Sequence, residues 1–266
     1  MFPPRTKALI ALPALAALGA LGLAGCSSSA ATSNVGLSDT KLLASFKAAV
    51  ASGTAVHVSG ALSSSGSSTS LDLQLNKDGS ASGEIGESGA TIPVKLVNGV
   101  TYTELTAGFL KLLAASDKSI TAAEISALQN QWVSSSDGSI GESLASSFEG
   151  LTSYDTFTST MANGDSTSTA SATATASASA TASASASASS SAGSGGVDLT
   201  KMTADGTTTY NGATVAVYKN ADGSTAYFAA SGPAYLLKAT STGADGGTMT
   251  FTWNQPTTVT APSSSS

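Results

Sequence analysis

Short runs of alternating apolar and polar residues, separated by hairpin turns, constrain the fold of this chain most. Leu71, Leu73 and Leu75 alternate with polar residues, which predicts a strand with one buried face. Asn98-Gly99 and Asn211-Gly212 are dipeptides that tight hairpins prefer. Nine or ten strands are expected, covering about 56–62, 71–76, 80–87, 92–97, 100–105, 206–210, 213–219, 225–230, 234–241 and 248–254. Consecutive antiparallel pairing gives two meanders.

Two parts of the chain have the helical period instead. Ser38 can cap a helix that ends at Gly53, with its apolar residues on one face. Helical spacing returns between 106 and 151, and a third short helix is expected there at 142–148. Helices this short are not stable alone and should pack on the sheet. The predicted fold class is therefore α+β.

The N-terminus has the layout of a secretion signal. Arg5 and Lys7 precede an apolar stretch over 8–24, and Leu-Ala-Gly stands directly before Cys26. This ending resembles the lipobox of bacterial lipoproteins, in which the cysteine receives diacylglycerol and the chain is cut in front of it. The resemblance implies a signal peptide over 1–25 and a lipid anchor on Cys26 that holds the protein on the extracytoplasmic face of the cell membrane.

An ordinary secretory signal, cut after Ala30 or Ala31, is the alternative. The cysteine count favours the lipobox, because the chain has one cysteine and exported proteins usually pair theirs in disulfides. Lipidation gives the single thiol a role.

The charge of the mature chain excludes some partners. Loss of Arg5 and Lys7 leaves 9 of the 11 basic residues against 17 acidic ones, a formal charge of −8. A negative chain is unsuited to nucleic acid and to electrostatic docking on anionic lipid. The acyl anchor is therefore the expected membrane contact, and we expect a monomer.

Three segments have compositions that cannot form a core. Residues 166–192 contain only serine, alanine and threonine, which predicts a disordered loop over about 162–197 within the domain. Its hydroxyls could carry sugars, or the loop could be an unmodified spacer. A flexible tether is expected over 26–36 and a disordered tail over 263–266.

The sequence does not point to an enzyme, a metal or a cofactor. His57 is the one histidine, and its position between Val56 and Val58 predicts a solvent-facing residue of a strand rather than a catalytic base. The carboxylates are scattered and form no recognisable acid–base pair. No catalytic residue is expected.

The order of these features resembles the LolA-like half-barrel lipoproteins of actinobacteria, the LprG/LppX type. It consists of a lipobox, a helix, a meander, a helical interruption, a second meander and the ending over 251–262. The resemblance covers 37–262, apart from the loop. It implies a strongly curved antiparallel sheet, a half-barrel, with helices on its concave face and an apolar cavity that takes acyl chains.

The helical interruption is where the resemblance places the cavity lining. Phe109, Leu112, Leu113 and Trp132 are the expected ligand contacts. The alternative is that these side chains fill the core and leave no cavity, because amphipathic helices bury such residues in any case.

Three functions remain open. The first is a membrane-anchored carrier or receptor for a lipid or glycolipid in the cell envelope. The second is an envelope module for protein interaction or stress sensing, without lipid cargo. The third is a passive, glycosylated envelope component.

Overall fold

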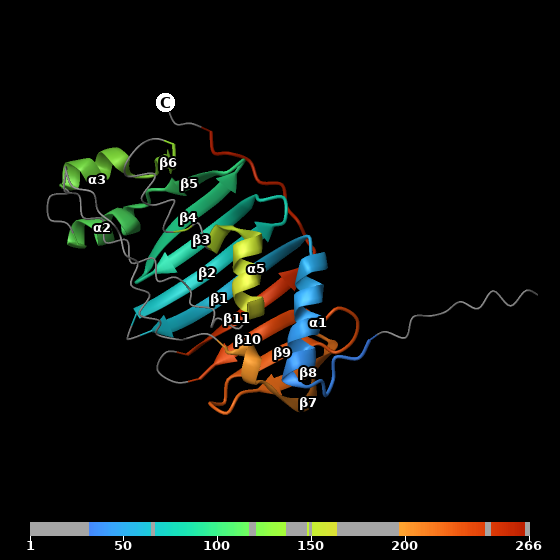
Figure 1. Ribbon diagram of the computed structural model, residues 1–266. Coiled ribbons are helices and arrows are strands. Elements are labelled where there is room, and N and C mark those ends of the chain that lie inside the picture. Colours follow the sequence, from blue (N-terminus) through green and yellow to red (C-terminus); the bar gives the residue numbers. More distant parts are fainter. Residues whose placement is uncertain are drawn as a thin grey trace, which may run out of the picture. The chain divides into compact units, whose positions relative to one another are not determined.

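The computed structural model describes residues 32–64, 67–116, 121–136, 148, 151–163, 197–242 and 246–263. Their strands form one open antiparallel sheet in the order β6-β5-β4-β3-β2-β1-β11-β10-β9-β8-β7 (Figure 1). The strands are β1 (Ala55–Ser64), β2 (Ser67–Asn76), β3 (Ala81–Glu87), β4 (Ala90–Val97), β5 (Val100–Glu104), β6 (Trp132–Ser134), β7 (Thr203–Tyr210), β8 (Ala213–Lys219), β9 (Thr225–Ala229), β10 (Leu236–Ser241) and β11 (Gly247–Trp253).

Two meanders meet in the middle of this sheet. Every neighbouring pair except β1 and β11 is consecutive in sequence, as short hairpin connections favour. β1 and β11, the first and last described strands in sequence, pair with each other in the middle of the sheet, with Val56 opposite Trp253 and Val58 opposite Phe251. The predicted α+β half-barrel is confirmed, with eleven strands in place of nine or ten.

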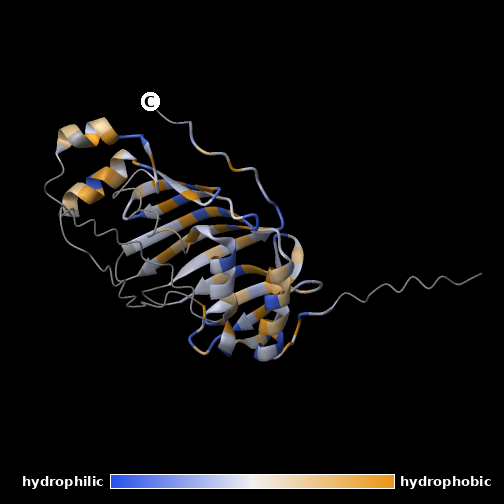
Figure 2. Cartoon of the chain, turned by 45° about the horizontal axis from the view of Figure 1, so that its top comes forward, coloured by the Kyte–Doolittle hydropathy of each residue, from blue (hydrophilic) through white to orange (hydrophobic). Residues whose placement is uncertain are grey.

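The alternation in the sequence separates the two faces of the sheet. Val56 and Val58 are fully buried, whereas His57 between them is half-exposed. Hydrophobic and hydrophilic residues are interleaved along the strands (Figure 2). We call the face that carries Val56 and Val58 the inner face and the opposite one the outer face.

The described helices pack on the inner face or on one another. They are α1 (Asp39–Ser52), α2 (Ala107–Ser116), α3 (Ala122–Leu128) and α5 (Tyr154–Asn163), with a short 3-10 helix η1 (Leu199–Lys201). α2 packs on β4, and α3 packs on α2. The expected boundaries of α1 at Ser38 and Gly53 are confirmed. α1 and α5 lie across the strands on one side of the sheet (Figure 1). No helix among the described residues is long and apolar enough to cross a membrane.

Aromatic packing fixes α1 to the centre of the sheet. The Phe46 ring meets Phe228 edge-on at 5.9 Å and Trp253 at 6.3 Å between centroids. The indole of Trp253 donates a hydrogen bond of 2.7 Å to the Leu236 carbonyl. A buried indole N–H needs such a partner. Val58 of the first meander is buried in the same hydrophobic cluster as these rings, so α1 and both meanders share one core.

Glycines let the inner face bend. A Cβ at Gly60 would overlap the backbone of Thr248 and Met249, and one at Gly83 would overlap Asp72 and Leu73. Strands approach too closely there for a side chain, and glycine marks such close approaches in bent sheets.

Some elements differ from the prediction. β6 and α5 were not expected, and of the helix expected over 142–148 only Phe148, a buried helical residue, is described. The loop expected over 162–197 begins within α5, which runs to Asn163, and it ends at Val197, which is buried. The rest of that loop and 264–266 lie outside the described residues.

The close approach at Gly83 gives a stability prediction. Gly83→Ala forces a methyl group against the backbone of the neighbouring strand, and we expect a loss of at least about 2 kcal/mol in the free energy of unfolding. Glu84→Ala, at the exposed neighbouring position, is the control and should change it by less than about 0.5 kcal/mol. Urea unfolding measures both, and equal values would refute a packing role for Gly83.

Candidate functional site

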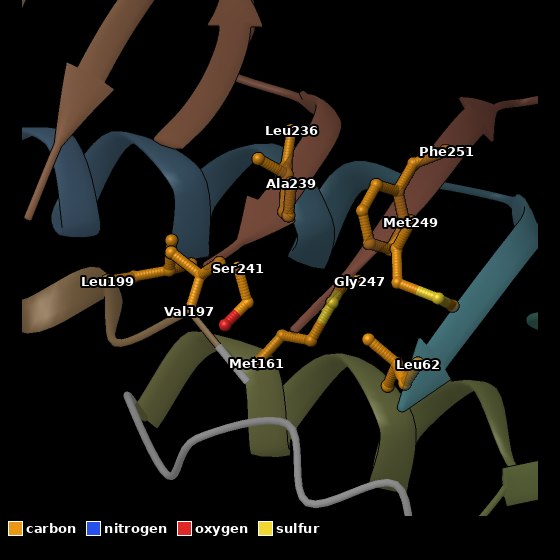
Figure 3. A pocket seen from close by; sticks show the side chains of 10 residues that line it. All are labelled: Leu62, Met161, Val197, Leu199, Leu236, Ala239, Ser241, Gly247, Met249 and Phe251. Carbon is orange, nitrogen blue, oxygen red and sulfur yellow. The ribbon is translucent and has the colours of Figure 1, made fainter. Parts of the chain in front are cut away.

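A small apolar cavity lies between the inner face of the sheet and the helices α5 and η1 (Figure 3). Its volume, as space open to the centre of a water molecule, is about 30 Å³. The lining consists of Leu62 from β1, Met161 from α5, Val197 and Leu199 around η1, Leu236, Ala239 and Ser241 from β10, and Gly247, Met249 and Phe251 from β11.

Small residues create the space. Ala239, Ser241 and Gly247 occupy inner-face positions where larger side chains would fill the gap below α5. Gly247 cannot be enlarged, because a Cβ there would overlap the backbone of Ala61 and Leu62. The close approach of β1 and β11 therefore keeps the Gly247 end of the cavity free of a side chain.

The lining suits an apolar ligand. No lining residue is charged, and Ser241 supplies the one hydroxyl. Met161 and Met249 contribute unbranched side chains that adapt to irregular partners. Nothing in this lining could activate a nucleophile or transfer a proton at neutral pH.

A buried tyrosine holds the first turn of α5 in place. The Tyr154 hydroxyl donates a 2.9 Å hydrogen bond to the Val50 carbonyl at the end of α1. Gly53 leaves room for that hydroxyl, which a Cβ would overlap. Burial, with smaller contributions from Tyr235 and Asp155, raises the pKa of Tyr154 to about 12. The other end of α5 places Met161 over the cavity.

The residues expected to contact a ligand do not line this cavity. Phe109 and Leu113 are buried in the core, as the core-filling alternative predicted, and Leu112 is half-buried. Trp132 pairs with Glu104 and lies on the outer face, where the Lys95 ammonium is 5.1 Å from its ring centroid. The structure does not bring the four residues together at one site, and their ligand contacts stay a prediction.

The sequence offered little to identify the actual lining. The apolar residues of β10 and β11 alternate as in any half-buried strand, and small residues at three inner positions are a weak signal. Met161 belongs to a helix that was not predicted. Cys26 lies outside the described residues.

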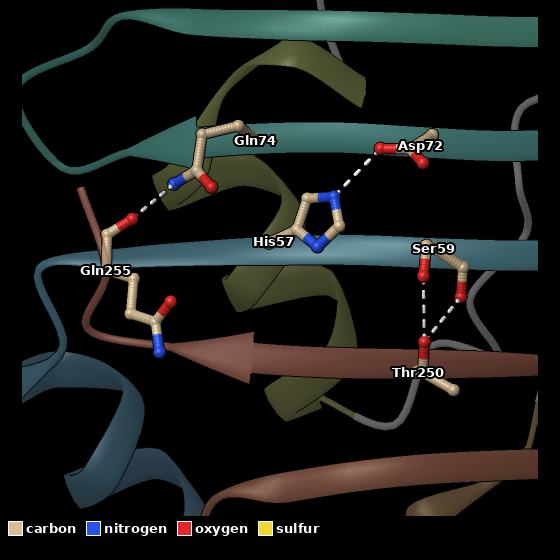
Figure 4. Close-up of polar contacts among 6 residues, drawn as sticks. All are labelled: His57, Ser59, Asp72, Gln74, Thr250 and Gln255. Carbon is tan, nitrogen blue, oxygen red and sulfur yellow. Dashed lines mark hydrogen bonds and ion pairs between the residues drawn. The ribbon is translucent and has the colours of Figure 1, made fainter. Parts of the chain in front are cut away.

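The outer face carries the histidine. His57 Nε2 lies 2.8 Å from Asp72 Oδ1, and the Ser59 and Thr250 hydroxyls share a hydrogen bond of 2.8 Å (Figure 4). This places His57 on the solvent-facing side, as expected. The part of the chain that the structure describes holds no cluster of three or more metal-ligating side chains.

No family model and no curated protein matches this chain. Solved structures that are similar to it include two mycobacterial proteins. LprF from Mycobacterium bovis is 11% identical, with a TM-score of 0.46, over 84% of this chain and 96% of that one. LppX from Mycobacterium tuberculosis is 18% identical, with a TM-score of 0.42, over 84% of this chain and all of that one.

LppX is a mycobacterial lipoprotein of the type that the sequence resembles.

The Tyr154 contact predicts a pH dependence. Its pKa is raised in the folded state, so the stabilisation is complete below about pH 10 and is lost as the pH rises toward 12. We expect Tyr154→Phe to lower the free energy of unfolding by about 1 kcal/mol at pH 8, through the lost hydrogen bond. The variant should also lose less stability than the wild type between pH 10 and 12. Urea unfolding measures both proteins across this pH range. If their free energies of unfolding fell by the same amount between pH 10 and 12, the role of the Tyr154 hydroxyl would be contradicted.

Proposed function

We propose that this chain is a lipid-anchored lipoprotein of the cell envelope that binds an acyl chain of a lipid or glycolipid in the cavity beneath α5. The lipobox-like sequence at Cys26 supports the anchor. The apolar, uncharged cavity between α5, η1, β10 and β11 is the observation that carries the binding function.

The chemistry of the lining favours hydrocarbon over polar ligands. An acyl chain needs no hydrogen bonds and gains about 0.8 kcal/mol for each CH₂ that it buries. A sugar or phosphate group would lose its hydration without gaining partners in a cavity that offers one hydroxyl. Any polar headgroup of the ligand therefore stays outside.

The size of the cavity means that binding requires movement. Its volume of about 30 Å³ suits about two water molecules, whereas ligand sites usually enclose about 300–1,000 Å³. α5 is fastened at Tyr154, so its Met161 end is the part best placed to move away from β10 and β11. Displacement of Met161 and Met249 would extend the cavity along the inner face.

The small volume also favours a second candidate. If α5 does not move, the inner face is a filled core, and the protein is an envelope interaction or stress-sensing module without lipid cargo. The surface would then carry the function.

Native mass spectrometry of residues 27–266, produced in an actinobacterial host, separates the two. A co-purifying species that disappears on organic extraction is the expected result, and its mass identifies the ligand. A protein that carries no such species before extraction would favour the interaction module.

A cavity-filling variant tests the location. Ala239→Leu puts three further carbons into the cavity, and we expect at least about a tenfold loss of affinity for a fluorescent fatty acid, equal to about 1.4 kcal/mol. Because the variant fills a void, its melting temperature should not fall. Thr240→Leu, at the neighbouring outer-face position, is the matched control and should bind normally. Equal affinities for the two variants would place the ligand elsewhere.

A further inference from the structure

The first described residues are bound to the sheet, although 26–36 was expected to be a flexible tether. The backbone N–H of Asn34 donates a hydrogen bond of 2.9 Å to the Ala230 carbonyl, and the backbone N–H of Gly232 donates one of 3.0 Å to the Thr32 carbonyl. These bonds form an antiparallel bridge between Ser33 and Ser231. The expectation is therefore wrong for 32–36. We call residues 32–37 the clasp.

Two buried polar side chains hold the clasp. The Asn34 side chain is 1% exposed and donates hydrogen bonds to the carbonyls of Ala229 and Gly232, at 2.9 and 3.0 Å. The Tyr218 hydroxyl donates to the Asn34 carbonyl at 2.6 Å and accepts from the Leu37 N–H at 3.0 Å. The composition of the segment did not reveal this, because the partners lie almost 200 residues away.

The clasp lies at one end of the strands and part of the cavity at the other. Ser231 and Gly232 belong to the β9–β10 turn, and we call the end of the sheet that carries this turn the anchor end. Leu62, Ser241 and Gly247 lie together at the opposite end, which we call the far end.

The covalent distance from the lipid is short. Thr32 is the sixth residue after Cys26, so even a fully extended chain between them spans no more than about 21 Å. The cavity-lining strand β10 has six residues and is itself about 20 Å long. If the clasp were flexible as well, the tether from Cys26 would extend to Leu37 and could span almost twice the distance from Cys26 to Thr32.

We propose that the clasp fixes the attachment point so that the anchor end of the sheet faces the anchoring bilayer and the far end is turned away from it. This rests on the lipidation of Cys26 in the proposed function. A mature charge of −8 gives anionic lipid no attraction for another surface of the domain. The attachment point is therefore what orients the domain.

Two exposed alanines on the outer face allow a matched test. Ala213 lies at the anchor end of β8, and Ala61 lies near the far end of β1. The pairing of β1 with β11 and of β11 through β8 relates the positions of the two alanines along the strand direction. In that direction they are about 20 Å apart. The natural thiol of Cys26 is lipidated, so a cysteine introduced at either position is the free thiol of the chain.

The experiment places lipidated Ala213→Cys and Ala61→Cys proteins, each carrying a fluorophore, on vesicles of phosphatidylcholine and phosphatidylglycerol with nitroxide-labelled headgroups. Because short-range quenching decays within the height difference of about 20 Å, we expect at least twofold stronger quenching at position 213. Equal quenching, or stronger quenching at position 61, overturns the orientation.

Two further variants test the clasp itself. The first variant has about twenty Gly and Ser residues inserted between Ala31 and Thr32, which add up to about 70 Å of reach. This insertion should abolish the quenching difference between positions 213 and 61. Asn34→Ala, checked for folding by circular dichroism, should reduce it by releasing the clasp. A difference that survives the insertion overturns the proposal.

The outcome is separable from the carrier function. A mass spectrum without diacylglycerol on Cys26 overturns the anchor and this orientation together. An empty cavity overturns the acyl-binding function and leaves the quenching difference unaffected.

Discussion

The pairing of β1 with β11 is the interaction on which the rest of the structure depends. It joins residues about 200 positions apart, with Val58 opposite Phe251, whereas every other strand pair is between neighbours in sequence. Without it, each meander would keep its hairpins but lose half of its core, because Val58 and Leu73 of the first meander are buried in the same hydrophobic cluster as Phe228 and Trp253 of the second. Closing so long a loop is entropically costly, and only the shared core offsets that cost.

This pairing decides where the middle of the chain has to go. The first meander ends at β6 and the second begins at β7, and these are the two edges of the sheet. Ten strand spacings separate them, about 48 Å along the sheet. In the described part of this connection, α5 lies across the strands on the inner face (Figure 1). The helix that roofs the cavity follows from the topology, although its own sequence is mostly polar.

The sequence predicted what local patterns can specify. Alternation at Leu71, Leu73 and Leu75 and the Asn-Gly turns identified the strands, and Ser38 and Gly53 bounded α1. It did not predict α5, whose burial depends on Tyr154 reaching Val50. Nor did it predict the clasp, because a small polar segment looks flexible until its distant partner Tyr218 is known. The cavity was missed for the same reason, since its walls come from five separate parts of the chain.

Curvature and cavity have a common origin in residues without large side chains. Gly60 and Gly247 let β1 and β11 approach so closely that a Cβ at either would overlap the opposite backbone. The same absence of side chains leaves space on the inner face, which Met161 and Met249 fill only in part. A side chain at Gly60 or Gly247 would push the central strands apart. At these two positions the sheet therefore cannot gain a fuller core without losing the pairing that holds its two halves together.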